Sequence, residues 1–133
     1  MWHSRYSPQP PVEAGFKALR DHGRYPINHL VVVKDEILDA NPGLAADLFD
    51  AFSRSKRAYV EALKGGSIDM PTPTDEVYRR VMESTRKDPL PYGIEPNQQV
   101  LENFIQDVVE QGIIDRPVGV HELFHAETHR LVG

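Results

Sequence analysis

Apolar residues recur at helical spacing in three long stretches of the chain. After the Asn-Pro pair at 41–42, which is typical of a helix start, large apolar residues stand at 44, 48, 52, 59 and 63 before Gly-Gly at 65–66. A second stripe follows Thr-Pro-Thr-Asp at 72–75 and runs to about Lys87, and a third begins at Pro96 and ends at Gly112. The pattern predicts three amphipathic helices.

Two shorter helices are also expected. Residues 12–22 carry Phe16 and Leu19 among charged neighbours and run into Gly23, a residue typical of a helix C-terminus. A short final helix is expected around residues 120–124, near the end of the sequence. The chain is therefore expected to be mostly helical.

One segment has the pattern of a strand. Residues 26–34, P-I-N-H-L-V-V-V-K, are continuously apolar and β-branched at their centre, as in a strand that is covered on both faces. The rest of the pattern offers no second strand, although backbone donors and acceptors of a strand need one. We expect this principal strand to pair with its copy in a homo-oligomer, or to belong to a larger α/β protein.

Composition narrows the classes of partner. The chain has 133 residues, which is the length of one domain. Because it has no cysteine, it can form neither disulfides nor thiolate metal sites. Its net charge of −5 lacks the excess of basic residues that binding of nucleic acid requires. Its longest apolar run has four residues, too few to span a membrane. Residues 1–11 are proline-rich, expected to be flexible, and unlike a secretory signal, so we expect a cytoplasmic protein.

Near the end of the sequence, His121-Glu122-Leu123-Phe124-His125 matches the H-E-x-x-H pattern of zinc peptidases. A zinc site of that kind needs a long supporting helix and a third ligand farther downstream, and few residues follow this motif. The sequence favours a terminal amphipathic helix that buries Leu123 and Phe124. No metal site is predicted.

The loop at 91–97, P-Y-G-I-E-P-N, carries candidate binding residues. Tyr92, Glu95 and Asn97 could be directed at one anionic ligand beside a helix N-terminus, together with backbone N–H groups. In the alternative interpretation, Glu95 and Asn97 cap the following helix and Tyr92 packs under the prolines. Spacing alone favours the alternative.

His29 lies inside the predicted strand, with Arg24 shortly before it. A histidine at a strand end that faces a cleft could donate a proton, and a guanidinium is the preferred partner of a carboxylate. A hydrogen-bonded core histidine and a solvated surface arginine are the alternatives.

Several blocks together resemble a known family. The segments G-R-Y-P-I-N-H-L-V-V-V, D-A-N-P-G-L-A-A-D-L-F-D-A-F, P-Y-G-I-E-P-N-Q-Q-V-L-E-N-F and H-E-L-F-H look like the C-terminal part of 4,5-dihydroxyphthalate decarboxylase-like proteins, in the same order. The resemblance covers roughly residues 23–125. It implies an α/β fold of the type II periplasmic-binding-protein class, with two lobes around a ligand cleft, of which this chain would be a single C-terminal segment.

The resemblance also implies a function. The chain would be part of a non-oxidative decarboxylase of a small aromatic carboxylate, and inactive alone. His29 would be the proton donor, Tyr92 and Glu95 would orient the substrate beside Asn97, and Arg24 would hold its carboxylate. Alternatives are a solute-binding module without catalysis and a small helical protein that dimerises through its strand. No cofactor is assigned.

Overall fold

The computed structural model describes residues 10–22, 27 and 29–133, and over these residues the chain forms helices and no strand. The element order is α1 (Pro11–His22), α2 (Asp35–Ala40), α3 (Leu44–Gly65), α4 (Pro73–Thr85), η1 (Glu95–Asn97), α5 (Gln98–Glu110), η2 (Val120–Leu123) and η3 (Ala126–Thr128), where η denotes a 3₁₀ helix. The predicted α/β fold with one principal strand is therefore wrong for this chain. The expectation of a mostly helical chain agrees with the structure.

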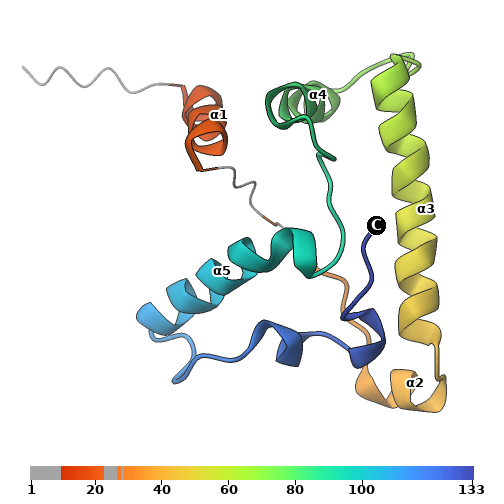
Figure 1. Ribbon diagram of the computed structural model, residues 1–133, viewed down its shortest axis with the longest axis vertical. Helices are drawn as coiled ribbons and strands as arrows, with labels where there is room; N and C mark the ends of the chain where they lie inside the picture. The colour runs from red at the N-terminus through yellow and green to blue at the C-terminus, as the bar shows by residue number, and fades with distance from the viewer. Residues whose placement is uncertain (1–9, 23–26, 28) are drawn as a thin grey trace, which may run out of the picture.

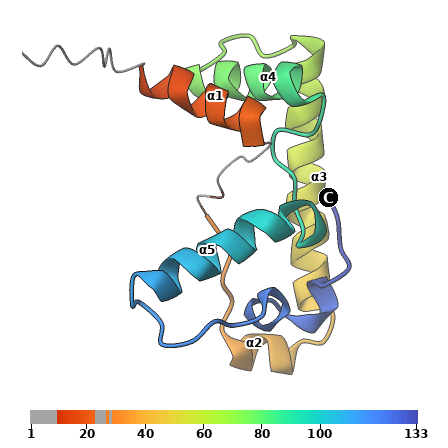
Figure 2. The ribbon, with the colours of Figure 1, turned by 60° about the vertical axis from the view of Figure 1, so that its left-hand side comes forward.

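Helix α3 runs the length of the molecule, with α4 near its C-terminal end, α1 on the side of α4 away from α3, and α2 at its N-terminal end (Figures 1 and 2). Its C-terminus at Gly66 has the positive φ of 65° that glycine accommodates best, as predicted. Its start differs from the prediction, because Asn41 caps the end of α2 by donating its side-chain amide to the carbonyl of Ile37. The true N-cap is Gly43, whose N–H donates to the Glu127 carboxylate at 2.9 Å.

Helix α4 begins as its sequence predicts. The Thr72 hydroxyl accepts from the Asp75 N–H at 3.3 Å, and the Asp75 carboxylate accepts from the Thr72 N–H at 2.6 Å, which completes a capping box. The Tyr59 hydroxyl of α3 donates to the same carboxylate. One aspartate therefore fixes the start of α4 and ties it to α3.

Helix α1 packs on α4 through a small apolar cluster, which we call the α1–α4 cluster: Phe16, Leu19 and Val81, with Val77 against them. The Arg80 guanidinium stacks on the Phe16 ring, 3.9 Å from its centroid, and pairs with Glu13 at 3.0 Å. Of the expected flexible N-terminus, residues 1–9 lie outside the described residues, whereas Pro11 already begins α1.

A second cluster, the α5 cluster, lies around the N-terminal half of α5. Its buried members are Ile94, Leu101, Ile105 and Val120, and Ile27, Val118 and Phe124 pack against them. Helix α5 follows the turn η1 and ends before Gly112, which has a φ of 68°. The third predicted helix is therefore confirmed, with a 3₁₀ turn at its start.

The segment predicted as a strand is extended but unpaired over its described part. Residues 29–33 have no backbone hydrogen bond to any other described residue, and Leu30, Val31 and Val32 are 55%, 65% and 90% exposed. A strand requires a hydrogen-bonded neighbour, which the described residues do not supply. Pairing of this segment with a second copy stays a prediction.

Within the described residues, no helix is both long enough and apolar enough to cross a lipid bilayer.

Candidate functional site

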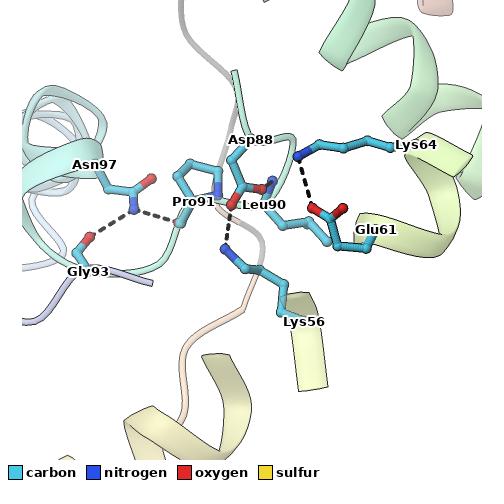
Figure 3. Close-up of polar contacts among 8 residues, drawn as sticks. All are labelled: Lys56, Glu61, Lys64, Asp88, Leu90, Pro91, Gly93 and Asn97. Atoms are coloured by element: carbon cyan, nitrogen blue, oxygen red, sulfur yellow. Dashed lines mark hydrogen bonds and ion pairs between the residues drawn. The ribbon is translucent and has the colours of Figure 1, made fainter. Parts of the chain in front are cut away.

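The loop between α4 and α5 is held by its own polar side chains (Figure 3). Asn97 donates both amide hydrogens inward, to the carbonyls of Pro91 and Gly93 at 2.8 Å each. At the other end, the Asp88 carboxylate accepts from the Leu90 N–H at 2.8 Å. These bonds fix the loop, which we call the 88–97 loop, in one conformation beside α3.

A buried lysine of α3 joins the helix to this loop. The Lys56 side chain is 2% exposed, and its ammonium pairs with the Asp88 carboxylate, which is 36% exposed. The Lys56 Nζ also lies 5.0 Å from the centroid of the Tyr92 ring, within the range of a cation–π contact. A lysine this well buried needs such partners, because removing an ammonium from water is costly.

The C-terminal residues close the loop from the other side. Tyr92 and Gly133 exchange two backbone hydrogen bonds, of 2.9 and 3.2 Å. Gly93 has a φ of 107°, and a Cβ there would clash with the carbonyl oxygen of Leu131. Glycine at 93 is therefore required by both the backbone conformation and the close approach of the C-terminal segment.

The three candidates of this loop have different surroundings. Tyr92 is half-buried beneath the Lys56 ammonium, whereas Glu95 is exposed in the turn η1. Asn97 occupies the N-cap position of α5 but makes no side-chain cap bond. Because both of its amide hydrogens are used inside the loop, only its Oδ1 is left, and this atom accepts hydrogen bonds and cannot donate to a carboxylate.

The proton-donor candidate, His29, lies close in sequence to a residue that packs against the α5 cluster. Ile27 packs against the cluster that contains Ile94, and His29 lies two residues farther along the chain, exposed to solvent. Two residues of extended chain span at most about 7 Å, so the Cα of His29 lies within that distance of the Cα of Ile27. Arg24 lies outside the described residues.

The H-E-x-x-H motif does not form the helix that its zinc interpretation requires. The 3₁₀ helix η2 ends at Leu123, and Phe124 has extended angles, φ −125° and ψ 145°, so the two histidines do not share a helical face. Glu122 accepts from the Gly119 N–H at 2.7 Å, and the His121 ring contacts His129, with 4.9 Å between centroids. No set of three potential ligands gathers anywhere in the described residues.

The terminal helix also differs from its expected burial. Phe124 packs against the α5 cluster as expected, but Leu123 is 48% exposed. Leu123 is the last residue of η2 and Phe124 already has extended angles, so the two side chains do not lie on one helical face.

Sequence reasoning missed Lys56 and Asp88. The sequence did contain a signal for Lys56, because this lysine occupies a position of the apolar stripe of α3, four residues after Phe52. A charged residue at a stripe position is either an exposed exception or a buried, paired group. Its partner could not be found from the sequence, because Asp88 lies in a loop with no periodic pattern.

Comparison with known proteins adds no relative: no family model, no curated protein and no solved structure matches this chain.

Proposed function

We propose that the chain binds a small aromatic carboxylate and forms the C-terminal portion of a non-oxidative aromatic-acid decarboxylase acting on 4,5-dihydroxyphthalate or a related compound. The observation that carries the proposal is the meeting of two segments that resemble the decarboxylase family. Ile27 of the first segment and Ile94 of the second belong to one cluster, although 66 residues separate them in the chain.

The chemistry explains why these two segments would be needed together. When the bond between the ring carbon and its carboxylate breaks, carbon dioxide leaves and the ring carbon must take up a proton. A ring hydroxyl para to that carbon stabilises the charge that develops, if a nearby acceptor orients it. We assign the proton transfer to His29 and the orientation of the ring hydroxyl to Glu95, both of which are exposed to solvent.

The other candidates take supporting roles. The Tyr92 phenol is placed by the Lys56 ammonium and by the backbone pair with Gly133, so it can contact the ligand without a large loss of rotamer freedom. Asn97 is a positioning residue, since its amide holds the loop in place. Arg24 remains the proposed carboxylate partner.

Binding is the first test. Titration of the isotopically labelled chain with 4,5-dihydroxyphthalate should give saturable amide shifts both near Ile27 and in the 88–97 loop. Tyr92→Phe and Glu95→Gln should each weaken binding about five- to tenfold, the loss of roughly one hydrogen bond. Glu36→Gln, which changes another exposed glutamate, is the matched control. Absence of saturable binding would overturn the proposal.

Turnover is the second test. The chain alone should release no carbon dioxide above the buffer rate, because reaction requires the substrate to be held in an oriented complex that one part of a site cannot supply. In a longer decarboxylase that contains this segment, His29→Gln should lower kcat about 100-fold and leave KM within about twofold. The control is His22→Gln. If the longer protein bound the substrate tightly and released no carbon dioxide, a solute-binding function would replace the enzymatic one.

A further inference from the structure

An open groove lies between α3 and α4. Lys56 and Asp88 line it, but none of the residues proposed to contact the aromatic carboxylate does. It has a volume of about 540 Å³, within the range of small-molecule sites. Val60 and Leu63 of α3 and Met82 of α4 give it an apolar floor, and Lys87 and Asp88 lie at one end.

The groove is strongly basic in an acidic protein. Its lining includes six cationic and three acidic residues, a net charge of +3, against −5 for the whole chain. The cations come from both helices and from the residues after α4: Lys56, Arg57, Lys64, Arg79, Arg86 and Lys87. Cations on facing walls of one cleft reinforce each other's field and raise the local concentration of anions.

These cations differ in how far they are neutralised. Lys56 pairs with Asp88, Lys64 with Glu61 at 3.2 Å, and Arg79 with Glu76 at 2.8 Å, as Figure 3 shows for the two lysines. The exposed Arg57 lies 4.0 Å from the Asp50 carboxylate. In contrast, neither Arg86 nor Lys87 has a carboxylate within 4.0 Å in the part of the chain that the structure describes. Two adjacent cations without counter-ions therefore stand at the end of the groove.

The backbone at this position is unusual as well. Arg86 has φ 58° and ψ 23°, the only positive φ outside glycine among the described residues. A glycine would take this helix-ending conformation with less strain, since a side chain in the left-handed region costs about 1 kcal/mol or more. A strained residue with a free guanidinium beside a cleft is a reason to look for a ligand.

We propose that this groove binds a small organic molecule with two or more carboxylate or phosphate groups, held chiefly by Arg86 and Lys87, with Arg57 on the facing wall. A guanidinium fits either kind of anionic group with two parallel hydrogen bonds. Basic residues on both walls favour more than one anionic group, and the apolar floor accommodates the carbon skeleton of the ligand. A nucleic acid fits less well, because its strand would extend beyond the groove onto the acidic remainder of the chain.

The experiment is a titration of the isotopically labelled chain with tricarballylate, pyrophosphate, acetate and a single-stranded oligonucleotide at constant ionic strength. Tricarballylate, pyrophosphate or both should give saturable shifts at amides lining the groove, and acetate should bind at least tenfold more weakly. The tighter binding of tricarballylate or pyrophosphate identifies carboxylate or phosphate as the preferred anionic group. Equal, non-saturable shifts with the three small anions would overturn the proposal, as would tighter binding of the oligonucleotide.

Variants locate the site. Arg86→Gly relieves the backbone strain, removes the guanidinium and should weaken binding at least tenfold, and Lys87→Gln should weaken it about fivefold. Lys87→Arg should restore most of that loss. Lys34→Gln, an exposed lysine outside the groove, should leave binding unchanged. If Lys34→Gln weakened binding as much as Lys87→Gln, the effect would be one of net charge alone and the proposal would fail.

Discussion

The two apolar clusters of this protein are built from different parts of the sequence. The buried members of the α5 cluster all lie between residues 94 and 120, so most of the cluster forms within one short stretch of chain. The α1–α4 cluster joins Phe16 and Leu19 to Val81 across nearly half of the length of the sequence. Closing a longer stretch of chain costs more conformational entropy, and fewer buried side chains compensate for it here.

The comparison shows how α3 is held. None of its residues belongs to either cluster, although Val60 and Leu63 are buried. Its tertiary contacts include the ion pair of the buried Lys56 with the partly exposed Asp88, and the hydrogen bond from Tyr59 to Asp75. The two clusters therefore differ in the number of their buried side chains and in the length of chain that separates their members. Helix α3, which belongs to neither cluster, is held in part by polar side chains.

The largest effect is expected in the α5 cluster. Leu101→Ala removes a buried side chain from its centre and should lower the free energy of unfolding by about 3 kcal/mol. Denaturant unfolding followed by circular dichroism measures this change. Phe104→Ala, on the exposed face of the same helix, is the control and should cost less than about 1 kcal/mol. Equal losses would mean that the exposed face of α5 is covered in solution.

A smaller and more local effect is expected in the α1–α4 cluster. Leu19→Ala should cost about 2 kcal/mol, because fewer apolar side chains surround it. Since this cluster is separate, α1 should detach while α5 stays folded. Hydrogen exchange should therefore quicken at amides of α1 and α4 and change little in α5. Uniform quickening over both regions would show that the two clusters unfold as one unit.

The link between α3 and α4 should depend on pH. Hydrogen bonds from the Tyr59 hydroxyl and from Thr72 lower the pKa of Asp75. Its contribution to stability is present above the unfolded pKa, about 3.9, and is lost as pH falls through the lower folded value. Asp75→Asn should flatten the fall in Tm below about pH 4, with Asp107→Asn as the control for loss of one carboxylate. If Tm fell as steeply at acid pH in Asp75→Asn as in the unchanged protein, Asp75 would not contribute to the loss of stability in acid.

The contribution of Tyr59 to stability has the opposite dependence on pH. Burial and the bond to the Asp75 carboxylate raise the pKa of the Tyr59 phenol to about 12. The protonated phenol therefore contributes stability that is present below the unfolded pKa of about 10 and is lost as pH rises through the folded value.

The smallest effect is expected in the exposed apolar segment. Val32→Thr keeps the β-branched shape and replaces a side chain that is 90% exposed, so it should change the free energy of unfolding by less than about 0.5 kcal/mol. Val81→Thr, a buried valine, is the matched control and should be clearly destabilising. A loss above about 1 kcal/mol at residue 32 would indicate that a partner covers the segment, and light scattering would then identify a second copy.

The sequence by itself determined the three long helices but not the short helix α2. Stripe spacing located α3, α4 and α5, and local chemistry specified their ends where neighbouring residues supply the cap, as Thr72 and Asp75 do for α4 and Gly66 does for α3. These features depend on interactions within a few residues, so a linear pattern contains them. The residue pattern directed attention to the loop at 91–97, but not to Lys56, which joins that loop to α3 through Asp88 and Tyr92.

Only the tertiary structure decided the rest, because it depends on contacts between distant residues. The apolar segment at 29–33 has the composition of a strand, yet no described neighbour pairs with it. Asn41 and Pro42 have the pattern of a helix start, yet the N-cap of α3 is Gly43, two residues after Asn41. There the Glu127 carboxylate accepts a hydrogen bond from the Gly43 N–H. The basic groove arises only when α3 and α4 bring their cations together, since no run of adjacent residues contains that charge.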